Sequence, residues 1–296
     1  MHAEPQPAQL PFPGGQPDAT VRLHPLLIAT GSGPEAWFHR EEGRLAGLRA
    51  IGGIGSQTRE VPYVAFLVEH PHAGLILIDT GFHPSVAVNP RQNLGRVMAF
   101  AFKDLQMDPA QAVSAQLRER GMSPGDIRVV IMTHLHADHA SAIAEFPDAT
   151  FIVSKREWEA ASEAGQMHGY VKRQFDHGFD YRLLDFEGPD ASSFSGFGRS
   201  FDLFGDGSMR TVFTPGHSLG HMSVVLRTKG VEVLVAGDAI YLRETLETAH
   251  LPYRVEDEHL FRRSLREIAQ YRKETPDALI IPGHDWEAWQ ALEAEY

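Results

Sequence analysis

Four side chains that can bind a metal lie within six residues, at His134, His136, Asp138 and His139. They come directly after the apolar run at 129–132. Three imidazoles so close together repel one another when protonated, and they gain little by facing an apolar core. A divalent cation removes that conflict, because each ring can give it an electron pair. Imidazole nitrogen and carboxylate oxygen are ligands that suit zinc and similar first-row metals.

Three further candidate ligands stand far along the chain, at His217, Asp238 and His284. Each comes directly after a glycine, and each follows an apolar run. Glycine at that place lets the backbone turn sharply and present the next side chain at the end of a strand. Together with the cluster this gives seven ligands, whereas one zinc takes about four. Two metals that share a bridging carboxylate would use all seven.

The ligands recur just after short apolar segments, and these segments alternate with helical patterns. Strands are expected at 61–69, 75–78, 128–132, 150–153, 209–213, 222–227, 231–236 and 278–281, and helices at 109–120, 141–145, 155–164 and 257–273. Strands that alternate with helices favour an α/β protein. Polar residues that follow such strands collect at one edge of a sheet.

The composition narrows the classes of function. The 296 residues suffice for a large core, and the net charge of -12 argues against a nucleic-acid-binding surface, which needs a basic face. The chain has no cysteine, which excludes disulfides, thiolate metal sites and cysteine nucleophiles. No stretch approaches the ~20 apolar residues of a membrane span. We therefore expect no nucleic-acid partner and no membrane partner.

The first 20 residues differ in composition from the rest. They contain five prolines and two glycines, which predicts a flexible or surface-wrapped N-terminal arm at 1–20. This segment lacks the apolar h-region behind a positive n-region that marks a signal peptide. A cytoplasmic location is therefore the expectation.

The order of these residues resembles that of the metallo-β-lactamase superfamily. The matching features are the run His134-Leu135-His136-Ala137-Asp138-His139, the preceding Thr133, the turn Asp79-Thr80-Gly81, the segment Thr214-Pro215-Gly216-His217, Asp238, and the final Gly283-His284. The resemblance covers roughly residues 60–290 of the chain.

Within the superfamily, the chain is similar to the N-acyl homoserine lactone lactonases, which degrade bacterial quorum-sensing signals. Tyr241 stands three residues after Asp238, where those enzymes have a tyrosine. The segments 154–161 and 281–285 also look like theirs. The chain departs from the compact lactonases in its longer N-terminal region, and it has Ala140-Ser141 where many relatives have Ala-Gly.

The resemblance implies a fold and a metal centre. The fold is the αβ/βα four-layer sandwich, with two mixed sheets flanked by helices, here as a single hydrolase domain at 21–296. The centre holds two divalent ions: one on His134, His136 and His217, the other on Asp138, His139 and His284, with Asp238 between them. Zinc is the first expectation, and iron, cobalt and manganese also tolerate these ligands. Asp79 is expected to fix its turn or orient a ligand, and His221 to be structural.

The resemblance also implies a reaction, catalysed with Asp138, Asp238 and Tyr241. A hydroxide shared by the two metals attacks the lactone carbonyl. A metal and the Tyr241 hydroxyl stabilise the oxyanion, and Asp138 helps to protonate the leaving alkoxide. The acyl chain would lie against one of two segments, 97–102 or 167–181. The partner is then a small lactone, with a homodimer also open because related lactonases are often dimers.

Other functions stay open at this point. A glyoxalase II-type thioesterase shares the metal motif but has a C-terminal helical region, which we do not expect after His284. A β-lactamase fits the two aspartates Asp138 and Asp238 less well, and a nuclease would need basic surface and further domains. A regulatory protein that kept the fold without activity is a different class, against which the complete ligand set argues.

Overall fold

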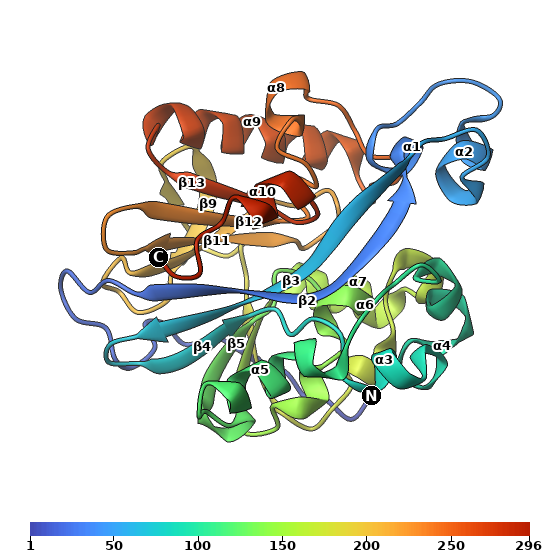
Figure 1. Ribbon diagram of the computed structural model, residues 1–296. Coiled ribbons are helices and arrows are strands. Elements are labelled where there is room, and N and C mark those ends of the chain that lie inside the picture. Colours follow the sequence, from blue (N-terminus) through green and yellow to red (C-terminus); the bar gives the residue numbers. More distant parts are fainter.

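Two mixed β-sheets face each other in the computed structural model, which describes residues 1–296 (Figure 1). The first sheet has the strand order β1 (Gln6–Pro7), β7 (Asp180–Leu184), β6 (Thr150–Ser154), β5 (Ile127–Ile131), β4 (Gly74–Ile78), β3 (Thr58–His70) and β2 (Arg22–Pro34). The second has the order β13 (Leu279–Pro282), β12 (Glu232–Gly237), β11 (Met222–Arg227), β10 (Met209–Phe213), β9 (Phe197–Asp202) and β8 (Ser192–Phe194). Strands β4 to β7 run parallel, as do β12 and β13.

Helices cover the outer face of each sheet (Figure 1). Below the first sheet lie α3 (Ser85–Val88), α4 (Pro90–Ala101), α5 (Val113–Glu119), α6 (Ala137–Ala140) and α7 (Lys155–Glu163). Above the second lie α8 (Thr245–Thr248) and α9 (Glu258–Glu274), while α1 (Glu35–Phe38) and α2 (Ala46–Gly52) project at one end and α10 (Trp286–Gln290) follows β13. The predicted four-layer αβ/βα sandwich is therefore confirmed.

Alternating side chains on the strands build the layers. In β5, Val130 packs toward the helices, whereas Val129 and Ile131 face the other sheet. In β12, Leu234 packs under α9 while Val235 faces the first sheet. Because successive strand residues point to opposite faces, each apolar strand supplies two cores at once.

Two predicted helices differ from the structure. The prediction of a helix at 141–145 is wrong, because α6 already begins at Ala137 and ends at Ala140. The His136 carbonyl accepts hydrogen bonds from the backbone nitrogens of His139 (3.0 Å) and Ala140 (2.9 Å). Only a single 3-10 turn follows, at Ile143–Glu145. At 109–120 the extended backbone of Ala112 separates a 3-10 turn from α5. The helix expected at 257–273 is confirmed as α9, and the Asp257 side chain caps its start.

The N-terminal segment lies along the molecule. Strand β1 pairs with β7 of the first sheet. The backbone nitrogen of Phe12 donates to the carbonyl of Leu203, which directly follows β9 of the second sheet. The Ala19 carbonyl accepts from the Arg227 guanidinium at 3.0 Å. The N-terminal arm thus contacts both sheets. The boundary between an arm at 1–20 and a single domain at 21–296 stays a prediction.

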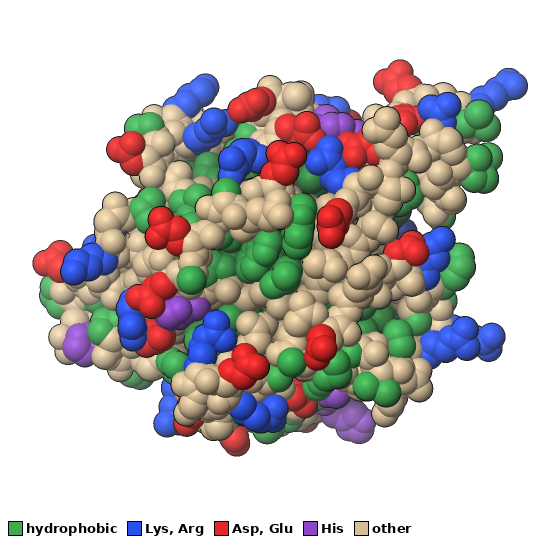
Figure 2. All heavy atoms as spheres, in the orientation of Figure 1, with side chains coloured by type: hydrophobic (Ala, Val, Ile, Leu, Met, Phe, Trp, Pro, Cys, Tyr) green, Lys and Arg blue, Asp and Glu red, His purple; other side chains and the backbone are tan.

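Charged side chains of both signs are interspersed on the face that Figure 2 shows. Apolar side chains stand exposed on the projecting α2 segment, at Leu45, Leu48, Ile51 and Ile54. No helix is both long and apolar enough to cross a membrane.

Candidate metal centre

The seven predicted ligands meet between the two sheets, although they come from four separate segments. The cluster at 134–139 follows β5 and runs into α6, which carries Asp138 and His139. His217 lies in the loop between β10 and β11, Asp238 directly follows β12, and His284 follows β13. The ends of one strand of the first sheet and three of the second therefore converge on one buried site.

Three histidines form one group of facing nitrogens, which we call the three-histidine group: His134, His136 and His217. The Nε2 atom of His217 lies 3.2 Å from Nε2 of His134 and 2.9 Å from Nδ1 of His136. Nitrogens that share one tetrahedral zinc at 2.0–2.1 Å are about 3.3 Å apart. The spacing therefore fits a single metal ion between the three rings.

A carboxylate and two histidines form a second group, which we call the mixed group: Asp138, His139 and His284. Oδ2 of Asp138 lies 3.5 Å from Nε2 of His139 and 3.6 Å from Nε2 of His284. The Nε2 atom of His139 is buried and has no hydrogen-bond partner. A buried polar atom left without a partner is costly, and a cation at this place would satisfy it.

Asp238 lies between the two groups and turns one oxygen toward each. Its Oδ1 atom is 3.3 Å from Nε2 of His284, and its Oδ2 atom is 3.3 Å from Nε2 of His217. Oδ1 is buried without a hydrogen-bond partner. A Cβ atom on Gly283 would stand 2.4 Å from that oxygen, so the glycine before His284 is needed for this close approach. The arrangement fits a carboxylate that bridges two ions.

The outer nitrogens of three rings are bound so that their inner nitrogens keep a free electron pair. His139 Nδ1 donates to Asp79 at 2.8 Å, and His284 Nδ1 donates to the Pro62 carbonyl at 3.0 Å. The Thr133 hydroxyl donates to Asp79 at 2.7 Å and can therefore accept from His134 Nδ1 at 3.1 Å. Such partners fix the tautomer and orientation of metal-binding imidazoles.

Tyr241 contacts the fourth ring through its hydroxyl, 3.0 Å from Nδ1 of His217. If Nε2 of His217 binds a metal, Nδ1 holds the proton and donates to the tyrosine oxygen. Burial and the charges of Asp238 and Asp138 raise the pKa of Tyr241, so its hydroxyl stays protonated. Its own proton then remains available for another acceptor.

His221 holds the backbone of Asp238 in place. Its Nε2 atom accepts from the backbone nitrogen of Asp238 at 3.1 Å, and its Nδ1 lies 2.9 Å from the Thr214 hydroxyl. Burial lowers the pKa of His221 to about 3, so it stays neutral and can accept that bond. Both nitrogens are thus occupied by the fold.

Asp79→Asn is expected to weaken metal binding in the mixed group by about 10–100-fold. Its backbone has φ 58°, a conformation that asparagine tolerates, so the exchange adds little strain. The amide nitrogen cannot accept from His139 Nδ1, and the ring would present a proton to the metal instead. Chelator competition measures the affinity. Asp18→Asn is the matched control, because Asp18 has φ 62° on the surface; an equal effect of both substitutions would contradict the account.

The two groups hold protons differently when no metal is bound. Burial lowers the pKa of His134 and His217, and it lowers that of His136 to about 4. Burial also opposes a charge on His139 and His284, but the adjacent carboxylates outweigh it and raise the pKa of both rings. At neutral pH a metal must therefore displace protons from the mixed group and not from the three-histidine group.

The ion in the mixed group is accordingly expected to leave first as the pH falls. Its affinity decreases as the pH falls below the raised pKa values of His139 and His284, because protons then compete with the metal for both rings. The ion on the three-histidine group is retained until the pH approaches about 4, the pKa of His136. Metal content after dialysis at stepwise lower pH measures this order. His284→Ala should lack the ion that is lost early; simultaneous loss of both ions from the wild type would contradict the prediction.

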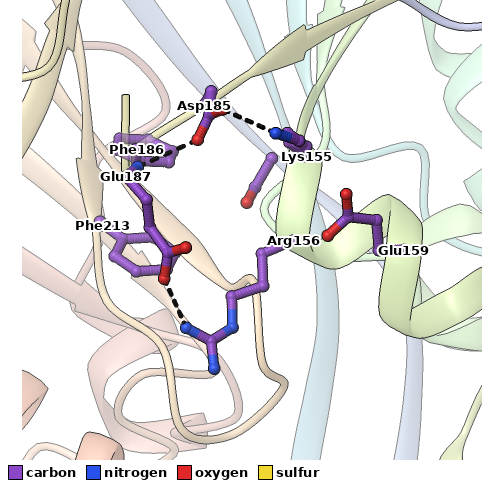
Figure 3. Close-up of a pocket in the computed structure, with 8 residues that line it drawn as sticks. Lys155, Arg156, Glu159, Asp185, Phe186, Glu187 and Phe213 are labelled. Carbon is purple, nitrogen blue, oxygen red and sulfur yellow. Dashed lines mark hydrogen bonds and ion pairs between the residues drawn. The ribbon is translucent and has the colours of Figure 1, made fainter. Parts of the chain in front are cut away.

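Two other places in the structure, a cluster of charged side chains and a cavity, lie apart from the seven ligands. Glu35, His39 and Glu244 lie together, but a cationic side chain already binds both carboxylates: Arg59 pairs with Glu35 at 2.8 Å and with Glu244 at 3.2 Å. A cavity of about 140 Å³ lies at the start of α7 (Figure 3). Four of its charged groups are paired, Lys155 with Asp185 and Arg156 with Glu187, each at 2.8 Å, and none of the seven ligands lines it.

Comparison with known proteins identifies the family. The family profile of the metallo-beta-lactamase superfamily matches residues 58–284. The chain is 34% identical to the N-acyl homoserine lactonase AttM of Agrobacterium fabrum over 234 residues, 78% of this chain and 84% of that protein. It is 33% identical to a probable metallo-hydrolase of Mycobacterium tuberculosis, over 73% of each chain.

Solved structures share the fold. An N-acyl homoserine lactone hydrolase with the product N-hexanoyl-L-homoserine at its catalytic metal center superposes with a TM-score of 0.74 at 23% identity, over 93% of this chain and 97% of that one. The dizinc quorum-quenching lactonase AidC does so with a TM-score of 0.62 at 15% identity, over 94% and 90%. The chain belongs to the metallo-beta-lactamase superfamily. It is a metal-dependent hydrolase of that superfamily.

Proposed function

We propose that this protein is a dinuclear lactonase that hydrolyses the ring ester of N-acyl homoserine lactones. The observation that supports this most is Asp238, whose two oxygens face two separate groups of ligands. The relatives named lactonases, at up to 34% identity, support the same substrate class. A glyoxalase II-type thioesterase is the competing function.

The chain's own residues have distinct tasks in this reaction. When bound, two divalent ions would polarise the ester carbonyl and lower the pKa of a water between them. Tyr241 would donate its free hydroxyl proton toward the carbonyl oxygen as negative charge develops there. Asp138 would take up a proton from the attacking water and pass it to the ring oxygen as the bond to the carbonyl carbon breaks. Water is thereby added across the ester, and the product is the open N-acyl homoserine.

The substrate class is tested with the metal-loaded protein on a panel of acyl homoserine lactones, a glutathione thioester and a β-lactam. Lactone opening is expected to be the fastest reaction, and His136→Ala is expected to abolish it, which excludes a contaminating activity. Slow lactone opening beside fast thioester cleavage would assign the protein to the thioesterases instead. No turnover of any substrate by a protein with two bound ions would favour the non-enzymatic class.

The segment 97–102 is the better candidate for binding the acyl chain. Phe102 packs edge-on against Tyr63, with ring centres 5.7 Å apart, and Tyr63 in turn lies 5.4 Å from the ring of His284. By contrast, Phe175 and Tyr181 of the segment 167–181 are fully buried in the helix-side core. An apolar chain entering beside the metals would therefore meet Tyr63 and Phe102 first.

Phe102→Ala is expected to reduce the preference for longer acyl chains. Each buried methylene contributes about 0.8 kcal/mol, which is about fourfold in kcat/KM per added CH₂ in the wild type. Loss of the ring should lower that increment, since less apolar surface is covered. Phe100→Ala is the matched control, because Phe100 is 73% exposed two residues away. Equal increments in both variants would contradict the assignment.

A further inference from the structure

A carboxylate outside the metal centre is completely buried beneath it. Glu157, in the first turn of α7, has no exposed surface. Four donors surround it: the backbone nitrogens of Leu135 and Gly220 and the hydroxyls of Tyr170 and Ser218. These bonds compensate the large cost of removing a carboxylate from water.

The two oxygens of Glu157 are divided between the two segments that make up the three-histidine group. Oε1 accepts from Leu135, which stands between His134 and His136, at 2.9 Å. Oε2 accepts from Ser218, the residue after His217, at 2.6 Å and from Gly220 at 3.1 Å. One side chain therefore ties both segments to the same helix.

Glu157 also fixes His136 through Tyr170. The Tyr170 hydroxyl donates to Oε1 at 3.1 Å, and its ring centre lies 4.8 Å from that of His136. His136 has no hydrogen bond on its outer nitrogen Nε2, unlike the other rings of the centre. Its orientation depends on packing against Tyr170 and the adjoining Gly169, where a Cβ atom would stand 2.7 Å from the imidazole.

The loop after His217 packs directly on the same turn of the helix. A Cβ atom on Gly220 would stand 2.0 Å from the backbone nitrogen of Glu157, so only glycine allows this approach. The mixed group is supported elsewhere, by Asp79 and the Pro62 carbonyl. Asp79 also supports His134 through Thr133, but Glu157 accepts no hydrogen bond from a residue of the mixed group.

We propose that Glu157 is the positioning residue of the three-histidine group: it holds the segments of His134, His136 and His217 at the spacing that lets their nitrogens share one ion. It contacts no ligand ring and takes no part in the reaction. It sets the affinity of one of the two metals and leaves the other unaffected. The inference rests on the two-metal site of the proposed function and is independent of the substrate.

Glu157→Gln is the sharpest test, because each oxygen accepts from one backbone nitrogen. Hydroxyls can turn to accept from an amide, but the backbone nitrogens of Leu135 and Gly220 cannot. Whichever way the new amide turns, one of these donors faces its NH₂ group. Glu159→Gln is the matched control, since Glu159 is exposed on the same helix.

The readout is metal affinity, measured by titrating metal-free protein with Co²⁺ and following both calorimetry and visible absorption. His136→Ala and His284→Ala identify the binding steps of the three-histidine and mixed groups. In Glu157→Gln, the step that disappears in His136→Ala is expected to weaken by about 10–100-fold. The step that disappears in His284→Ala should change by less than about twofold, and Glu159→Gln should match the wild type.

Equal weakening of both steps, or of neither, would overturn the inference, as would the same effect in Glu159→Gln. If Glu157→Gln does not fold, Tyr170→Phe is the second test, because it removes one of the four donors to Glu157. A smaller loss of metal affinity, confined to the step of the three-histidine group, supports the inference. No loss of affinity, or an equal loss in both steps, overturns it. A wild type that binds no metal overturns this inference and the proposed function together. If it binds a single ion, the two-metal function fails, and weakening of that ion in Glu157→Gln decides the inference.

Discussion

Asp238→Asn is expected to lower kcat/KM for lactones by more than about 100-fold, beyond the 10–100-fold typical of a lost outer hydrogen bond. The substitution keeps the size of the side chain and removes one ligand atom, because an amide nitrogen does not bind these metals. It also removes a negative charge that lies 3.3 Å from both His217 and His284. The bound metal should therefore fall from two ions toward one, as measured by elemental analysis beside the lactone assay.

Asp277→Asn is the control for this substitution, since Asp277 is exposed after α9. It should bind two ions and turn over lactones at the wild-type rate. Circular dichroism of Asp238→Asn checks that the fold is kept. An Asp238→Asn protein with two ions and a near-normal rate would show that this carboxylate does not bridge the metals.

Removal of the metals is expected to abolish activity and to lower thermal stability together. The ligands come from four segments at 134–139, 217, 238 and 284, so bound ions cross-link the two sheets. A ligand at about 100 times its Kd stabilises the folded state by about 2.7 kcal/mol, and each of two tightly held ions contributes at least that much. Chelation, followed by an activity assay and a thermal scan, measures both effects.

Readdition of zinc should restore the rate and the melting temperature of the metal-free protein. His284→Ala provides the comparison, because loss of one ligand from the mixed group should leave one ion and part of the stabilisation. Full activity after complete chelation, with metal content verified below about 0.1 ion per chain, would contradict a metal-dependent reaction.

The convergence of the seven candidate ligands was predictable because chemistry and position coincide in the sequence. His217, Asp238 and His284 each follow an apolar strand and a glycine, and the structure gives the reason: Gly237 has φ 54°, and Gly283 approaches Asp238 too closely for any side chain. The strands before them were predictable from short apolar runs with turn residues behind them.

The rest required tertiary structure. Strand β2 was not predicted, since Pro25, Gly31 and Gly33 interrupt its pattern; an edge strand tolerates these residues, and β2 lies at the edge of the first sheet. Glu157 was missed as a functional residue because a glutamate in a helix ordinarily faces water. Its four donors come from residues up to 63 positions away, which no local pattern reveals.

Metal analysis of fully active protein shows whether one chain holds two metal ions around a shared carboxylate. The protein is dialysed against metal-free buffer, assayed on a lactone, and analysed for total zinc, iron, cobalt and manganese. We expect two equivalents per active chain, falling to one in His284→Ala. Full activity with at most one tightly held equivalent would contradict it.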